Sequence, residues 1–308
     1  MKLSHKYLII FLGPTAVGKT ALCLKIAQLF QTEIISSDSR QFYKETNIGT
    51  AKPTESELKS VPHHLIGTKS IHNPYDVKDF ENEALQVLDV IFKTHDIAIM
   101  AGGSGLYIDV ICKGLDDIPD IEPKIREKII SEFEEKGIEF LQRELEKFDP
   151  DYFQTVDRNN PQRLMRAIEV FRGTGKPFSS FRVKNLIQRP FKIIKIGLER
   201  EREELYERIN KRMEMMIRQG LFEEAEALFP FRHLNALQTV GYSEIFGYLE
   251  GKYDKEEAVR LLKRNSRRYA KRQMTWFRRD SEVLWFHPEQ EKEIIQCIKN
   301  EIIKAEKP

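Results

Sequence analysis

Short hydrophobic runs alternate with longer amphipathic stretches along most of this chain. The strand-like runs are Tyr7–Leu12, Glu33–Ser36, Ile97–Ala101, Lys192–Leu198 and Val283–Phe286. The intervals between them carry mostly helical periodicity, with apolar residues every three to four positions. Such alternation predicts an α/β fold in which helices flank a parallel sheet.

One long interval lacks any convincing strand. From Pro119 to Arg189 the apolar spacing is helical, with stretches at Glu122–Lys136, Ile138–Phe148 and Pro161–Phe171. We therefore predict an all-helical insertion domain over residues 119–189. The remaining segments, 1–118 and 190–308, then form a single core around the parallel sheet.

Composition limits the possible partners. The 308 residues include 50 basic and 48 acidic ones, a net charge of +2, so any nucleic-acid surface must be local. Apolar runs are too short for a bilayer span and the N-terminus lacks a signal-peptide pattern, which predicts a cytoplasmic protein without membrane contact. Three scattered cysteines are expected to be reduced packing residues. A monomer is expected.

The strongest motif follows the first strand. It matches G-x-x-x-x-G-K-[ST] and precedes the amphipathic stretch Ala21–Phe30, which is the context of a phosphate-binding P-loop. Backbone N–H groups and a helix N-terminus would face an anion, the lysine would add a charge, and the threonine hydroxyl would bind Mg²⁺. Its residues are Gly13, Pro14, Thr15, Ala16, Val17, Gly18, Lys19 and Thr20.

A polar segment, Ser36–Tyr43, begins where the second strand should end. Because parallel strands end at a common sheet edge, this segment is expected beside the P-loop. Asp38 could act there as a general base, or as a ligand of magnesium or substrate. It could equally cap a helix, which is a common role for aspartate.

Gly102, Gly103, Ser104 and Gly105 follow the strand Ile97–Ala101. They could form a second anion-facing turn, or only a tight connection to the next helix. No aspartate ends this strand, although P-loop NTPases use one there to hold the magnesium of a nucleotide. This absence weakens the interpretation of the chain as a phosphate-hydrolysing enzyme.

Three basic segments remain. Gln162, Arg163 and Arg166 lie within about one helical turn, and could contact phosphates and bases or form a solvated face. Arg208 and Arg212 share a helix face that could point into the phosphate site, or pair with Glu204 or Glu201 on the surface.

The third basic segment, Arg260–Arg279, contains nine basic residues and no acidic one, which favours RNA binding. Its apolar stripe includes Tyr269 and Trp276. These aromatics could stack on bases, but such spacing is more typical of core residues.

Together these residues resemble the tRNA dimethylallyltransferase (tRNA isopentenyltransferase) family, bacterial type, over nearly the whole chain. The stretches that carry the resemblance are Gly13–Thr20, Asp38–Tyr43, Ile48–Pro53, Val61–Leu65, Gly102–Tyr107, Pro161–Val170, Val240–Tyr242 and Ala270–Trp276. Each is weak alone, but their order and spacing are specific. The resemblance implies a P-loop NTPase-like fold and transfer of a dimethylallyl group from dimethylallyl diphosphate to the 6-amino group of adenosine 37 in tRNA.

The resemblance also implies roles for single residues. Asp38 matches the general base, while Lys19, Thr20 and Arg212 match groups that hold the diphosphate together with Mg²⁺; Arg208 is the other candidate for that contact. Ser104 stands where many members have threonine. The segments matching tRNA contacts, together with the basic helix, comprise Asp38, Ser39, Arg40, Gln41, Ser104, Gln162, Arg163, Leu164, Met165, Arg166, Arg267, Arg268, Lys271 and Arg272. The helical insertion would contact the anticodon stem-loop.

Three rival functions fit parts of the pattern. A small-molecule kinase would use the P-loop but needs an acidic strand end for its metal. An adenylate isopentenyltransferase would alkylate a free nucleotide and would not need the helical insertion or the basic helix. A non-catalytic RNA-binding protein would leave Asp38 without a task.

Overall fold

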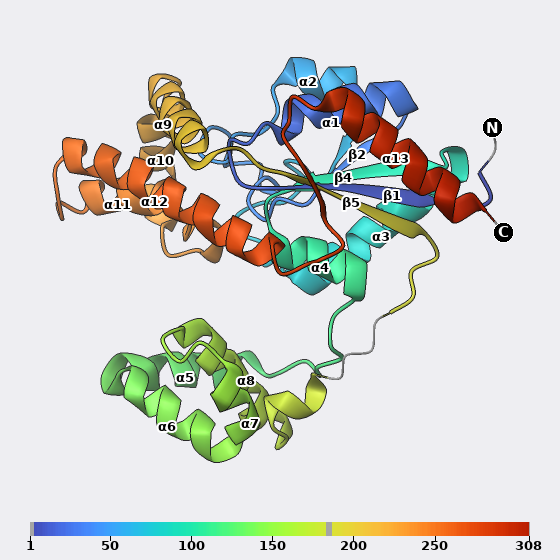
Figure 1. Cartoon of the computed structure of the whole chain (residues 1–308). Coiled ribbons are helices and arrows are strands. Elements are labelled where there is room, and N and C mark those ends of the chain that lie inside the picture. Colours follow the sequence, from blue (N-terminus) through green and yellow to red (C-terminus); the bar gives the residue numbers. More distant parts are fainter. Residues whose placement is uncertain (1–2, 183–186, 308) are drawn as a thin grey trace. The chain divides into compact units, whose positions relative to one another are not determined.

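The computed structural model describes residues 3–182 and 187–307, and within them the strands form one parallel sheet of six. The strand order is β3-β2-β4-β1-β5-β6, and Figure 1 labels β2, β4, β1 and β5. Their bounds are β1 Tyr7–Leu12, β2 Ile34–Ser36, β3 His63–His64, β4 Ile97–Gly102, β5 Lys192–Leu198 and β6 Leu284–Phe286. The five predicted strands and the α/β class are confirmed. β3 was missed because two histidines carry no hydrophobic signal.

Helices of the sheet-containing unit cover the strands and extend beyond them. They are α1 Lys19–Phe30, α2 Glu55–Ser60, α3 Val77–Thr94, α4 Gly105–Lys113, α9 Arg202–Arg218, α10 Leu221–Leu228, α11 Tyr242–Leu249, α12 Lys255–Phe277 and α13 Glu291–Glu306. Ile26 of α1 and Ile298 of α13 are fully buried in one core with strand β1. A second core joins α9 to α10, α11 and α12.

The helical residues between α4 and β5 form a compact unit of their own. The chain divides into residues 1–112 with 188–308, and residues 113–187. The second unit contains α5 Pro123–Lys136, α6 Ile138–Phe148, α7 Pro150–Thr155 and α8 Pro161–Thr174, packed around apolar residues such as Ile129, Leu141 and Ile168. The predicted insertion, 119–189, includes residues 183–186, which lie outside the described part of the chain.

The strand register determines which loops meet. Leu12 is paired with Gly102 on one side and with Gly197 on the other, while Ser36 is paired with Ala101. The segments after β1, β2 and β4 therefore leave the sheet at the same edge. This edge, at the carboxyl ends of parallel strands, is where open α/β sheets bind ligands.

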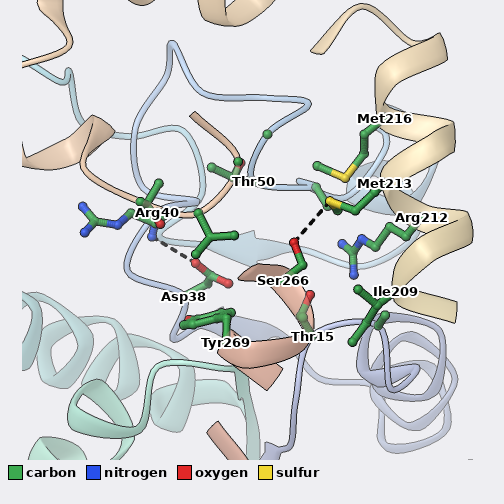
Figure 2. Close-up of a pocket in the computed structure, with 16 residues that line it drawn as sticks. Thr15, Asp38, Arg40, Thr50, Ile209, Arg212, Met213, Met216, Ser266 and Tyr269 are labelled. Carbon is green, nitrogen blue, oxygen red and sulfur yellow. Dashed lines mark hydrogen bonds between the residues drawn. The ribbon is translucent and has the colours of Figure 1, made fainter. Parts of the chain in front are cut away.

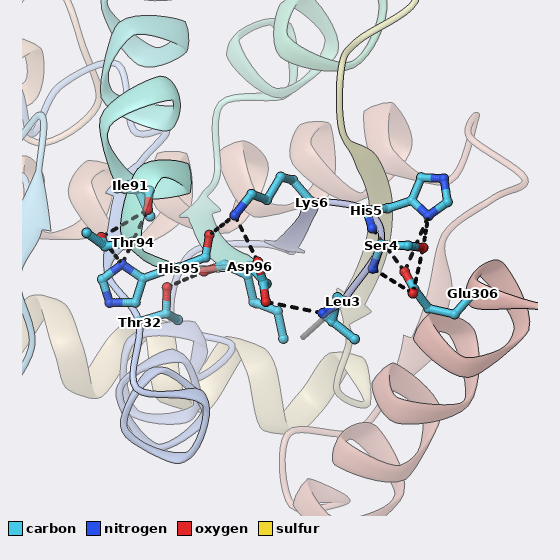
Figure 3. Close-up of polar contacts among 11 residues, drawn as sticks. Leu3, Ser4, His5, Lys6, Thr32, Ile91, Thr94, His95, Asp96 and Glu306 are labelled. Carbon is cyan, nitrogen blue, oxygen red and sulfur yellow. Dashed lines mark hydrogen bonds and ion pairs between the residues drawn. The ribbon is translucent and has the colours of Figure 1, made fainter. Parts of the chain in front are cut away.

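The carboxylate of Glu306, on α13, binds residues at the start of β1 (Figure 3). Glu306 of α13 accepts hydrogen bonds from the Ser4 N–H at 2.8 Å, the Ser4 hydroxyl at 2.7 Å and the Tyr7 hydroxyl at 2.7 Å. Hydrogen bonds to the ionised form favour it, and they lower the pKa of Glu306 to about 2. This contact stabilises the sheet-containing unit away from its ligand-binding edge.

None of the helices within residues 3–182 and 187–307 has the length and apolarity that a membrane span needs.

Candidate functional site

The P-loop curls because three of its residues adopt positive φ angles. Gly13 has a φ of 150°, Ala16 of 63° and Gly18 of 116°. A Cβ atom on Gly13 would lie 2.6 Å from the Leu198 carbonyl oxygen, so this position needs glycine. The loop delivers the chain into α1 at Lys19, and the N-terminus of this helix is a favourable place for an anion.

Lys19 lies over its own loop. Its Nζ donates to the carbonyl oxygens of Gly13 at 2.8 Å and Pro14 at 2.9 Å. Burial lowers the pKa of Lys19 to about 8, and Arg212 acts in the same direction, whereas Asp38 opposes the shift. Thr20 follows in the first turn of α1, where it is exposed. Contact of either group with a bound phosphate stays a prediction.

Asp38 opens a turn rather than a helix. Its Oδ1 accepts a hydrogen bond from the Arg40 N–H at 3.0 Å, and the next helix, α2, begins only at Glu55. The helix-cap interpretation is therefore wrong. The residue instead lines a cavity together with Thr15 of the P-loop and Arg212 of α9 (Figure 2).

Ser104 joins two strand ends. Its hydroxyl accepts from the Ser39 N–H at 2.9 Å and donates to the Ser39 hydroxyl at 3.1 Å, while its carbonyl begins the turn into α4. The segment after β4 is thus a strand-to-helix connection whose hydroxyl positions the residue next to Asp38. A role for Ser104 in anion binding stays a prediction.

The two arginines of α9 face the loop and the cavity. Arg208 donates from Nε to the Ala16 carbonyl at 2.9 Å, and Arg212 lines the cavity. Burial lowers the pKa of Arg212, and the Asp38 carboxylate opposes that shift. The alternative of a surface pair with Glu204 is not observed, because Glu204 binds Arg200 instead.

The cavity has walls of two kinds (Figure 2). Thr15, Asp38, Arg40 and Arg212 supply polar groups, and apolar surface comes mainly from Ile209, Met213, Met216 and Val240. Most ligand sites combine apolar walls with a few placed polar groups. This cavity suits a molecule with an anionic end and an apolar end.

Gln273 was missed as a site residue. It lies on α12, is 7% exposed, accepts a hydrogen bond from the Thr15 N–H at 2.9 Å and donates one to the Gly103 carbonyl at 2.9 Å. It thus ties the P-loop to the segment after β4. The sequence signal was a polar residue on the apolar stripe of an otherwise basic helix.

Tyr269 lines the cavity, so the core interpretation of this residue is only partly right. Burial and the nearby Asp38 carboxylate raise the pKa of Tyr269 to about 12. Trp276 is partly buried, and its Nε1 donates to Asp109 at 3.0 Å. Tyr269 therefore forms part of the site, whereas Trp276 holds α12 against α4.

Arg200 also supports the P-loop, and no sequence pattern pointed to it. Its Nε donates to the Val17 carbonyl at 2.9 Å. Its guanidinium also lies 3.2 Å from His287 Nε2 and 3.5 Å from a Glu289 carboxylate oxygen, and it pairs with Glu204. The residue types of Glu204, His287 and Glu289 would allow a metal ion, but the Arg200 guanidinium already lies among them and offsets one of the two negative charges.

Most of the predicted tRNA contacts near Asp38 bind protein groups. Arg40 donates from Nη1 to the Asn235 carbonyl at 2.8 Å, and Gln41 donates to the carbonyls of Thr50 and Ala51, each at 3.2 Å. Ser39 binds Ser104, as described above. In this structure these side chains therefore position the loops around the cavity, and RNA contact by them stays a prediction.

The basic face of α12 is largely open. Arg268, Lys271 and Arg272 are exposed, and no salt bridge with a carboxylate is found for them among the described residues. Arg267 is partly buried and donates to Asn210 at 2.7 Å. The charges of Arg268, Lys271 and Arg272 are therefore available to an anionic partner.

On α8 the predicted contact segment divides into two faces. Gln162 accepts from Arg126, Arg163 is exposed, and Arg166 pairs with Glu169 at 3.2 Å. Leu164 and Met165 are 0% and 3% exposed in the core of the helical unit. Their side chains pack the helix, so the structure gives them no route to direct contact with RNA, in contrast to the sequence-based expectation.

Comparison with known proteins settles the family. A model of the family described as IPP transferase matches residues 41–280, well over half of the chain. The chain belongs to the IPP transferase family. The match begins after the P-loop and Asp38, so the roles of those residues rest on their motif and geometry.

Relatives of this IPP transferase cover nearly its whole length. The tRNA dimethylallyltransferase of Christiangramia forsetii is 52% identical and covers 96% of this chain and 98% of its own. The tRNA dimethylallyltransferase of Cytophaga hutchinsonii is 51% identical, with 97% and 98% covered. The family expected from the sequence is confirmed.

Solved IPP transferase structures share the fold. The full-length tRNA isopentenylpyrophosphate transferase from Bacillus halodurans has a TM-score of 0.72 at 36% identity, covering 97% of each chain. A eukaryotic dimethylallyltransferase acting on tRNA has a TM-score of 0.74 at 28% identity, covering 88% of this chain and 69% of the other. The sheet and its helices are thus common to bacterial and eukaryotic members.

Proposed function

We propose that this enzyme transfers the dimethylallyl group of dimethylallyl diphosphate to the exocyclic 6-amino group of adenosine 37 in tRNA. The observation that carries the proposal is the cavity in which the P-loop residue Thr15, Asp38 and Arg212 face apolar side chains of α9. An anionic leaving group and an apolar isoprenoid fit these two walls. The family of the chain supplies the reaction class.

In the reaction, the bond between C1 of the isoprenoid and the diphosphate oxygen breaks while the adenine nitrogen forms a bond to C1. The electron pair leaves with the diphosphate. Lys19, Arg212 and the P-loop N–H groups would stabilise the charge that develops there, and groups fixed in advance contribute most at this point. Arg208, which is bound to the Ala16 carbonyl, would hold the loop itself.

Asp38 would take the proton that the attacking amine loses. Its Oδ1 is held by the Arg40 N–H, and its carboxylate faces the cavity, so the base has a fixed direction. Ser104 acts through Ser39 by holding the neighbouring backbone. Tyr269 lines the cavity close to Asp38.

Mg²⁺ fits the oxygen donors of this site. Thr20 offers an exposed hydroxyl in the first turn of α1, and Mg²⁺ characteristically takes few protein ligands besides water and phosphate oxygens. When bound, the ion would neutralise diphosphate charge and so assist its departure.

The tRNA would be held by charge outside the cavity. The exposed Arg268, Lys271 and Arg272 of α12 and Arg163 of α8 are among the cations that could take part, and neutralising phosphates releases counterions. We further propose that the helical unit contacts the anticodon stem-loop, and that the enzyme works as a monomer in the cytoplasm, where its substrate is used.

The test is a transfer assay with purified protein, dimethylallyl diphosphate and Mg²⁺, offering unmodified tRNA or AMP. We expect isopentenyladenosine in digested tRNA and no reaction of AMP. Modification of AMP but not of tRNA would replace this proposal by an adenylate isopentenyltransferase. Phosphate transfer from ATP to a small molecule, without prenylation, would instead indicate a kinase.

A further inference from the structure

The apolar wall of the cavity comes mainly from one face of α9. Ile209, Met213 and Met216 follow one another at helical spacing, and Arg212 lies beside them. Because Arg208 touches the P-loop carbonyl of Ala16, the part of α9 around Arg208 lies at the P-loop end of the site. At about 1.5 Å per residue, Met216 lies roughly 12 Å further along the helix axis.

The two methionines lie at the end of the cavity remote from the P-loop. Figure 2 shows them above Arg212, on the side away from Thr15. They are 8% and 4% exposed, and they pack into the core that contains Leu221 and Leu262, both 0% exposed. The space beyond them is therefore filled by protein.

Met213 is also fixed by a hydrogen bond. The Ser266 hydroxyl donates to its sulfur at 3.4 Å, and Ser266 is itself buried and lines the cavity. Methionine is otherwise the most adaptable apolar side chain. A held methionine can limit the length of a ligand, whereas a free one would move aside.

We propose that Met213 and Met216 form the end wall that limits the isoprenoid donor to five carbons. This inference rests on the proposed function, because it assumes that the diphosphate lies at the P-loop and the isoprenoid extends along α9. Truncation of both methionines to alanine removes about as many heavy atoms as one further isoprene unit contains. A ten-carbon geranyl group would then find room.

The experiment is a competition between dimethylallyl diphosphate and geranyl diphosphate for transfer to the same tRNA, with products separated by mass. Wild-type protein should use the five-carbon donor. In Met213→Ala/Met216→Ala we expect the ratio of kcat/KM for geranyl to that for dimethylallyl diphosphate to rise at least about tenfold, the discrimination expected for apolar volume.

Two further variants make the result specific. Met215→Ala is the matched control, because Met215 lies on the same helix but is 51% exposed and outside the cavity; its donor ratio should equal that of wild type. Ser266→Ala keeps both methionines but frees Met213, and should shift the ratio in the same direction by a smaller factor. Far-ultraviolet circular dichroism and thermal melting check that each variant folds.

The outcomes separate this inference from the proposed function. If wild-type protein transfers no dimethylallyl group to tRNA, the proposed function fails. If it does, and a folded double variant keeps the wild-type ratio, the end wall lies elsewhere and the inference is wrong. Should the double variant not fold, Met216→Val removes less volume and carries the same test.

Discussion

The site at the carboxyl ends of β1, β2 and β4 (the strand-end site) and the exposed face of α8 both contain polar side chains, but their hydrogen bonds and ion pairs span different distances in sequence. At the strand ends, contacts span large distances in sequence: Ser39 with Ser104, Thr15 with Gln273, and Gln273 with Gly103. On α8 the polar residues bind within their own small unit, such as Arg166 with Glu169 three positions away. The strand-end site thus has fixed geometry, which chemistry needs, whereas the polar side chains of α8 are held only within the helical unit; RNA binding by this face stays a prediction.

The largest expected effect is at the strand ends. Asp38→Asn keeps the size of the side chain but removes the base, so kcat should fall by about 10²–10⁴-fold, while the Kd for tRNA stays within about twofold. Single-turnover transfer and filter binding measure the two quantities. Asp89→Asn, at an exposed position of α3, is the control; a folded Asp38→Asn protein with normal turnover would remove Asp38 from the mechanism.

The next largest effect is expected from the link between the P-loop and the β4 turn. Gln273→Ala removes one part-buried and one buried hydrogen bond, together worth on the order of 1–2 kcal/mol, and should lower kcat/KM for dimethylallyl diphosphate about tenfold. Gln296→Ala, at an exposed position of α13, should have no effect. If initial rates for the two variants were equal, the P-loop would not depend on α12.

Changes on α8 should act on binding alone. Arg163→Glu reverses one exposed charge, and we expect KM for tRNA to rise several-fold while kcat stays constant. The slope of log Kd against log salt concentration should become less steep by roughly 1, as for a lost phosphate contact. Arg143→Glu is the control: it makes the same charge reversal at another exposed position, on α6. Equal effects of the two variants would mean that the net charge of the protein, and not a contact at Arg163, determines tRNA affinity.

The smallest effect on activity is expected at Glu306, which binds residues at the start of β1, at the other end of this strand from the strand-end site. Because its folded-state pKa is lowered from 4.5 to about 2, it stabilises the fold above its ordinary pKa and loses that contribution as pH falls from about 4.5 towards 2. Glu306→Gln should therefore melt a few degrees below wild type at neutral pH, with a gap that closes in acid.

Calorimetric Tm values across that pH range check this expectation, with Glu226→Gln, exposed on α10, as control. A gap that stayed constant down to acid pH would mean that the Glu306 charge contributes nothing. Lost activity at unchanged Tm would mean that this end of the sheet also affects the chemistry.

The sequence predicted those parts of the site that local patterns encode. The P-loop needs only eight consecutive residues, and Asp38 stands two residues after the end of a strand, so motif and strand order were enough to bring them together. Arg200 and Gln273 were missed because their P-loop partners lie 183 and 258 residues away. Only the folded sheet places these groups side by side.

The sequence also left the basic helices undecided, because exposure depends on packing. Leu164 and Met165 are apolar in the sequence, and the family resemblance nevertheless placed them among the tRNA contacts; in the structure they turn inward. On α12, by contrast, polar residues turn inward: Gln273 and Ser266 are buried, and Ser266 lines the cavity. Helical periodicity predicts which residues share a face of the helix, but it does not predict whether that face packs against protein, lines a cavity or is exposed to solvent.

The most direct test of the central claim is to locate the product within tRNA. Protein, dimethylallyl diphosphate and Mg²⁺ are incubated with a transcript carrying adenosine 37 and with one carrying guanosine there, and nuclease fragments are analysed by mass. We predict one added dimethylallyl group, on the anticodon-loop fragment of the first transcript only. Equal addition to both transcripts, or addition to another fragment, would contradict the account.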